Sequence, residues 1–149
     1  MNLSGDAVRQ LLAKYELDAE RDLVLIYDDL DFPLGTLKIR ERGGPGTHNG
    51  VDSVIASIGT QRFARLRLGI GSEKQGKHRE GYVLKQFRAG ERKKVGAVME
   101  LAQDAVEAIV KDGLSAAMNR FNQSEEAKAK EAAKKEAKKK TPASPGDGT

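Results

Sequence analysis

Three stretches of the chain carry apolar side chains at the spacing of an amphipathic helix. The first follows Ser4, which we expect to be its N-cap. The second covers residues 51–58 and ends at Gly59, and the third covers residues 95–109 and ends near Gly113. The apolar positions that define the third helix are Val95, Val98, Met99, Ala102, Val106 and Ile109.

Three other stretches have the pattern of β-strands. Residues 23–27 form a continuous apolar run that stops at Asp28, which is typical of a strand covered on both faces and paired on both sides. Residues 36–40 and 65–70 instead alternate apolar and polar side chains, as more exposed strands do. Strands interleaved with helices predict an α/β domain with a parallel or mixed sheet.

The apolar patterning ends near Asn122, after a short helix expected over residues 114–121. Residues 125–140 are almost entirely Glu, Ala and Lys and have no apolar stripe, so a helix there would have nothing to bury. We therefore expect one domain over residues 1–122 and a tail over residues 123–149 that is disordered or a solvated helix.

Composition and charge limit the classes of partner. A chain of 149 residues with 38% hydrophobic residues is expected to form one domain. The formal net charge is +4, but the first 122 residues hold 19 basic and 17 acidic residues, a net charge of +2. Binding of a polyanion must therefore depend on a local basic patch rather than on overall charge.

Several kinds of site are excluded by the residues that the sequence lacks. No apolar stretch approaches the roughly 18 residues of a membrane span, and the first ten residues lack a signal-peptide pattern, so we expect a cytoplasmic protein. The absence of cysteine excludes disulfides, thiol nucleophiles and thiolate metal sites. With only two histidines, a His-based zinc site is disfavoured.

A glycine-rich loop over residues 43–50 leads into the second helix and carries the strongest chemical signal. Free N–H groups and the helix dipole make a helix start favourable for an anionic or polarised oxygen. The Asn49 amide could donate to a developing oxyanion, and His48 could donate, accept or transfer a proton. N-terminal capping of the helix is an equally good interpretation of these residues.

Three carboxylates follow the apolar strand, at Asp28, Asp29 and Asp31. Sites of α/β proteins lie at the carboxyl ends of strands, where one carboxylate could orient an imidazole and stabilise its charge. The alternative is a solvated loop. Metal binding is a weaker option, because the spacing is not that of a calcium loop.

Two features suggest contact with phosphate. Arg65 and Arg67 should share one face of their strand, with Leu66 on the opposite face, and paired arginines suit phosphate capture. Solvent-exposed charge is the alternative. The sequence of residues 71–77 nearly matches the Walker A motif of a nucleotide-binding loop. However, His78 stands where Ser or Thr would hold magnesium, so nucleotide hydrolysis is disfavoured.

Four segments together, in order and spacing, resemble bacterial peptidyl-tRNA hydrolase: residues 1–5, 27–35, 43–50 and 65–71. The resemblance spans residues 1–122. It implies an α/β domain with a mixed, mostly parallel sheet and flanking helices. It also implies hydrolysis of the ester bond between peptide and tRNA in peptidyl-tRNA, without metal or cofactor, by a cytoplasmic monomer.

The resemblance also assigns roles by position. Asn2 and Asn49 match substrate-contacting asparagines, and Met1 borders the same cleft. Asp28 matches the carboxylate that stabilises the catalytic histidine of the family. His48 matches a histidine beside the site that is not the principal base.

Two further matches concern the RNA. Arg40 and Arg67 fall where the family places basic residues that hold the tRNA 5′-phosphate. In the family, a first strand and a histidine-bearing segment precede the Met-Asn-Leu-Ser-Gly motif, which here begins at Met1. We therefore expect a truncated chain that lacks the first strands and the base, and that is inactive as written. The alternative function is a noncatalytic protein that binds the 3′ end of tRNA.

Overall fold

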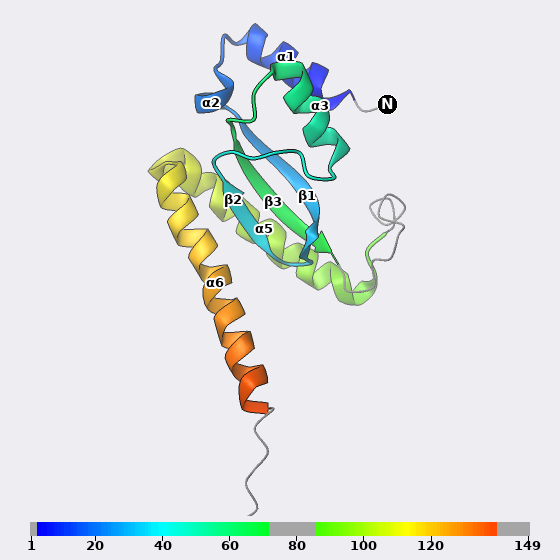
Figure 1. Ribbon diagram of the computed structural model, residues 1–149, viewed down its shortest axis with the longest axis vertical. Coiled ribbons are helices and arrows are strands. Elements are labelled where there is room, and N and C mark those ends of the chain that lie inside the picture. The colour runs from blue at the N-terminus through cyan, green and yellow to red at the C-terminus, as the bar shows by residue number, and fades with distance from the viewer. Residues whose placement is uncertain (1–2, 72–85, 140–149) are drawn as a thin grey trace, which may run out of the picture.

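The computed structural model describes residues 3–71 and 86–139. Helices pack on a small sheet, with α5 across one face, while α1 and α3 lie together at one end of it (Figure 1). In chain order the elements are α1 (Ser4–Lys14), α2 (Ala19–Asp22), β1 (Val24–Pro33), β2 (Leu37–Arg40), α3 (Asn49–Ile58), β3 (Ala64–Gly71), α5 (Ala89–Asp112) and α6 (Leu114–Lys139).

The sheet is mixed, as expected. Its order is β1-β3-β2, with β1 parallel and β2 antiparallel to β3. The alternating pattern of β2 is confirmed, because Leu37 and Ile39 are buried. The prediction that residues 65–70 form a more exposed strand is wrong, because β3 is the central strand and is mostly buried. The prediction that the apolar run is covered on both faces is wrong: within the described residues β1 pairs only with β3, and the side chain of Ile26 is 48% exposed.

Strand β1 is also longer than predicted and runs past Asp28 to Pro33. An irregularity in its pairing with β3 lies between Asp29 and Pro33. This end of β1 approaches β3 so closely that a Cβ atom at Gly69 would lie 2.1 Å from the carbonyl oxygen of Pro33. Glycine is therefore required at this position of β3, since any side chain would collide with backbone.

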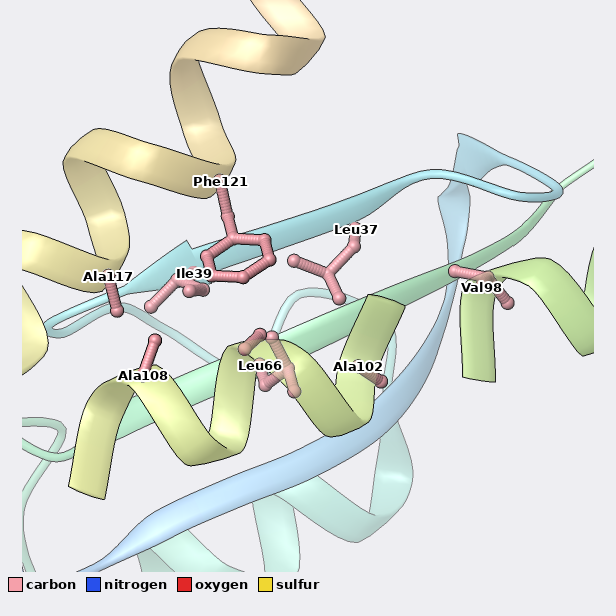
Figure 2. Close-up of a cluster of buried hydrophobic side chains, with 9 residues drawn as sticks. Leu37, Ile39, Leu66, Val98, Ala102, Ala108, Ala117 and Phe121 are labelled. Carbon is pink, nitrogen blue, oxygen red and sulfur yellow. The ribbon is translucent and has the colours of Figure 1, made fainter. Parts of the chain in front are cut away.

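The main hydrophobic core lies between the sheet, α5 and α6 (Figure 2). Of the helix positions predicted to be apolar, Val98 and Ala102 are buried, but Met99 is 55% exposed, which corrects that assignment. Alanines take most of the buried positions of α5, because small side chains allow a helix to lie close to a sheet. The cluster is formed by Leu37, Ile39, Leu66, Val98, Ala102, Ala105, Ala108, Ala117 and Phe121.

Some boundaries differ from the sequence-based prediction. Leu3, not Ser4, is the N-cap residue of α1. The short helix α2 was not predicted at all, and it begins where the side chain of Asp18 accepts a hydrogen bond from the N–H of Glu20. The helix predicted to end at residue 121 continues as α6 to Lys139 without a break.

Helices α1 and α3 contact each other at Gly5. Its N–H donates to the Ser53 hydroxyl oxygen at 3.0 Å, and a Cβ atom on Gly5 would lie 2.0 Å from the Ser53 carbonyl oxygen. The glycine of the first motif therefore fixes where α1 meets α3. Within the described part of the chain, no helix is long and apolar enough to cross a bilayer.

Candidate active site at the start of helix α3

His48 joins the start of α3 to strand β1. As the N-cap residue of α3, it accepts a hydrogen bond from the N–H of Val51 at its Nδ1 atom, at 3.2 Å. Its Nε2 atom lies 3.3 Å from an Oδ1 atom of Asp28. The ring of Tyr27 packs edge-on against the imidazole, with centroids 5.0 Å apart. The sequence left capping and chemistry as alternatives for His48; the structure shows that it caps α3 and that its second ring nitrogen faces Asp28.

These two contacts assign the proton on the neutral imidazole. Because Nδ1 accepts from Val51, the proton lies on Nε2 and points to Asp28. The hydrogen bond to Asp28 raises the pKa of His48 above its ordinary 6.5, although partial burial of the ring opposes this. The same hydrogen bond lowers the pKa of Asp28 below its ordinary 3.8. Asp28 is therefore a carboxylate at neutral pH.

Asn49 is the first residue of α3 and is exposed. Its backbone position places it among the helix N–H groups that have no intrahelical acceptor. The loop before it turns sharply, since Gly46 has φ of +56° and the N–H of His48 donates to the Pro45 carbonyl at 3.1 Å. The glycine-rich loop therefore leads into α3 with His48 as the N-cap and Asn49 as the first helical residue.

The predicted acidic cluster lies within β1 rather than in a solvated loop, and its members differ. Asp28 is half-buried and faces His48. Asp29 is only 8% exposed; one of its oxygens accepts from the Asp31 N–H at 2.8 Å, and the other contacts Arg67 at 2.5 Å. Asp29 therefore supports the fold, whereas Asp28 is the carboxylate available to the site.

The basic residues of the sheet lie in register across β2 and β3. Lys38 is paired with Arg67, and Arg40 with Arg65. Leu66 lies in the core on the opposite face, as the alternation predicted. Arg67 is bonded to Asp29, and its guanidinium stacks on Phe32 at 4.6 Å.

The two remaining arginines of this face differ in exposure. Arg65 is 1% exposed and so cannot be a surface contact for phosphate. Arg40 is half-buried, and its side chain makes no hydrogen bond or ion pair with another described residue. The resemblance assigned Arg40 and Arg67 to RNA, and of these two Arg40 is the more available, because Arg67 is bonded to Asp29.

Part of the predicted site lies outside the described residues. Met1 and Asn2 do, and so do His78 and nearly all of residues 71–77. Among residues 3–71 and 86–139, no three His, Cys, Asp or Glu side chains come together as a metal site would require. One site residue was missed from the sequence: Tyr27, which follows its apolar neighbours without any separate signal. Arg65 was singled out for phosphate capture, but no strand pattern indicates that it is buried.

A family model described as peptidyl-tRNA hydrolase matches residues 1–131. The chain belongs to this family. A peptidyl-tRNA hydrolase of Chloroflexus aggregans is 48% identical over 122 residues, which cover 82% of this chain and 65% of that protein. One from Koribacter versatilis is 43% identical over 126 residues, covering 85% and 63%.

The fold agrees with the same family. A crystal structure of peptidyl-tRNA hydrolase from Acinetobacter baumannii superposes with a TM-score of 0.74 at 30% identity, covering 82% of this chain and 61% of that one. The resemblance and the α/β fold expected from the sequence are thus confirmed. The chain spans less than two thirds of the length of these relatives.

Proposed function

We propose that this chain takes part in the hydrolysis of peptidyl-tRNA at the ester between the peptide and the terminal ribose. The observation that carries the proposal is the hydrogen bond between His48 and Asp28, made beside the exposed Asn49 at the start of α3. A carboxylate that holds an imidazole, beside amide donors at the start of a helix, suits ester hydrolysis, in which a charged imidazole and an oxyanion must both be stabilised.

In the proposed reaction, water attacks the carbonyl carbon of the ester while the imidazole of the principal base removes a proton from that water. Asn49 and the N–H groups at the start of α3 stabilise the oxyanion that forms. The tetrahedral intermediate then breaks its bond to the ribose oxygen, which leaves and takes up the proton that the imidazole removed from water. The carboxylate of Asp28 orients the imidazole and balances its charge. The resemblance assigns the principal base to a histidine that precedes the first motif in the family, with His48 as an auxiliary group.

RNA recognition is assigned to the basic face of β2 and β3. Arg40 offers a guanidinium without a side-chain partner among the described residues, and Arg67 is held in place by Asp29 through its Nε and Nη2 atoms. Both suit a terminal phosphate, since guanidinium groups bind phosphate bidentately. Met1 and Asn2 complete the proposed substrate site, and we propose that the whole protein acts as a monomer in the cytoplasm.

The test compares two adjacent carboxylates in a protein that carries the family's histidine-bearing segment ahead of the first motif. Asp28→Asn removes a charge beside the imidazole, so we expect kcat to fall by about 10²-fold or more with a smaller change in KM. Asp29→Asn is the matched control: it should lower the melting temperature and leave kcat within a few-fold. Equal and small effects on kcat would contradict the role of Asp28.

The second candidate is a noncatalytic protein that binds the 3′ end of tRNA. It is favoured by the exposed Asn49 and the available Arg40, because these side chains can bind RNA without a catalytic base. Tight binding of peptidyl-tRNA without turnover by the extended protein, unchanged by Asp28→Asn, would establish this candidate over the enzyme.

A further inference from the structure

Arg65 is a buried cation without a carboxylate partner among the described residues. It is 1% exposed, and its Nε atom has no hydrogen-bond partner there. Only carbonyl oxygens and the ring of Phe63, 4.3 Å from the guanidinium carbon, compensate for the lost hydration. Because a buried charge is costly and an apolar side chain of similar size often gives equal or better stability, stability alone does not account for this arginine.

The contacts of Arg65 bind the two loops that flank α3. Its Nη1 atom donates to the carbonyl of Gly44 at 3.1 Å, in the loop that enters the helix. Its Nη2 atom donates to the carbonyl of Gln61 at 3.0 Å, in the loop that leaves it. The Gln61 carbonyl also accepts from the N–H of Gly43 at 3.3 Å. The guanidinium thus holds together the two loops that flank α3.

A short path leads from this contact to the site. Gly44 precedes Pro45, whose φ is fixed by its ring and whose carbonyl accepts from the N–H of His48. Any displacement of Gly44 is therefore passed to His48 through one rigid residue and one hydrogen bond. The distance between His48 and Asp28 depends on where the loop is held.

We propose that Arg65 is a positioning residue, which fixes the glycine-rich loop so that His48 reaches Asp28. The contacts of Arg65 with the loop do not depend on the proposed function. Only the expected effect of this positioning on turnover rests on that proposal. Lysine cannot replace it, because one ammonium at the end of a flexible stem does not reach two carbonyls in fixed directions.

The experiment follows His48 by NMR in the full chain, from the pH dependence of its Cε1–H signal. The sequence has two histidines, so His78→Gln assigns the signals. In Arg65→Lys the pKa of His48 should fall toward its ordinary value, because the Asp28 contact lengthens. Arg62→Lys, at an exposed arginine three residues earlier, should leave the pKa unchanged.

A second arm separates positioning from folding. Arg65→Ala leaves a space that free guanidinium ion can enter, and its addition at millimolar concentration should restore the His48 pKa. A folded Arg65→Lys protein with an unchanged His48 pKa would overturn the proposal. So would Arg65 variants that unfold and regain nothing with guanidinium, because Arg65 would then serve the core alone. Neither readout requires substrate, so failure of the proposed hydrolysis would be seen separately, in the kinetics of Asp28→Asn.

Discussion

Neighbouring carboxylates of β1 have different tasks because successive side chains of a strand point in opposite directions. Asp28 meets the imidazole of His48, while Asp29 contacts Arg67 and the backbone N–H of Asp31. Three acids within four positions look equivalent in the sequence. The difference between them arises only from what each side chain faces.

The pH dependence of stability should reveal the His48–Asp28 pair. The pKa of His48 is raised, so its contribution is complete below about 6.5 and is lost as pH rises through the folded-state pKa. The pKa of Asp28 is lowered, so its contribution is complete above about 3.8 and is lost as pH falls through its folded-state pKa. The pair therefore stabilises most between about pH 4 and 6.5.

Urea unfolding of the native chain and of Asp28→Asn, measured from pH 3 to 9, checks this expectation. The difference in free energy of unfolding should be largest inside that window and should shrink above it. A difference that keeps growing from pH 7 to 9 would mean that Asp28 does not interact with a protonated imidazole.

At the scale of elements, a side chain makes hydrogen bonds to the backbone at the outer edge of β2. The amide of Asn122 in α6 donates to the Ile39 carbonyl at 2.9 Å and accepts from the Ile39 N–H at 3.0 Å, as a neighbouring strand would. Asn122 lies where the sequence predicted the end of the domain. It joins α6 to the sheet, and the side chains of α6 that are described beyond residue 132 are exposed.

The contact between α1 and α3 should make Gly5 intolerant of any side chain. Gly5→Ala places a methyl group against backbone at Ser53, so the helices must separate, and we expect a loss of about 1–3 kcal/mol in the free energy of unfolding. Gly96→Ala in α5 is the matched control, because a Cβ atom there meets nothing within 4 Å. Better helix propensity should make it neutral or stabilising by up to about 1 kcal/mol. Urea denaturation measures both, and equal effects would refute the close-contact argument.

For the whole molecule, the small net charge makes placement of charge more important than its amount. Lys38, Arg40 and Arg67 lie together on one face of the sheet, and Asp29 neutralises part of this group. The proposed binding of tRNA should therefore depend on few phosphates, so the affinity should decrease only slightly as the salt concentration rises. The Lys-rich end of α6 projects away from the sheet (Figure 1).

The proposed phosphate contact can be separated from the chemistry with two substrates. In the extended protein, Arg40→Ala should weaken binding of peptidyl-tRNA that carries a 5′-phosphate and reduce the slope of log affinity against log salt by roughly 0.7 to 0.9. Cleavage of a short substrate with only the 3′ end should barely change. Arg67→Ala should act in the same direction but also lower the melting temperature, because it leaves Asp29 buried and unpaired.

Arg62→Ala is the control for a general loss of positive charge, since Arg62 is exposed and lies outside the strands. Loss of activity on the short substrate equal to that on full tRNA would make Arg40 a structural or chemical residue instead of an RNA contact.

The sequence by itself determined what depends on neighbours along the chain. Apolar periodicity placed α3, α5 and the alternating strands, and Gly59 and Gly113 predicted the helix ends correctly, because these signals act within one or two turns. The motif at residues 43–50 predicted an imidazole and an amide at a helix start. Four motifs in order were sufficient for the family.

Only the tertiary structure decided which of these groups meet. The sequence could not show that His48 faces Asp28, that Arg65 is buried beneath the loop, or that Met99 is exposed, because each outcome depends on residues distant in the chain. The apolar run of β1 indicated burial, yet Ile26 is about half exposed, since burial depends on which strands and helices are present beside it. Local pattern fixes the conformation of a segment, whereas side-chain surroundings are fixed by packing over long separations.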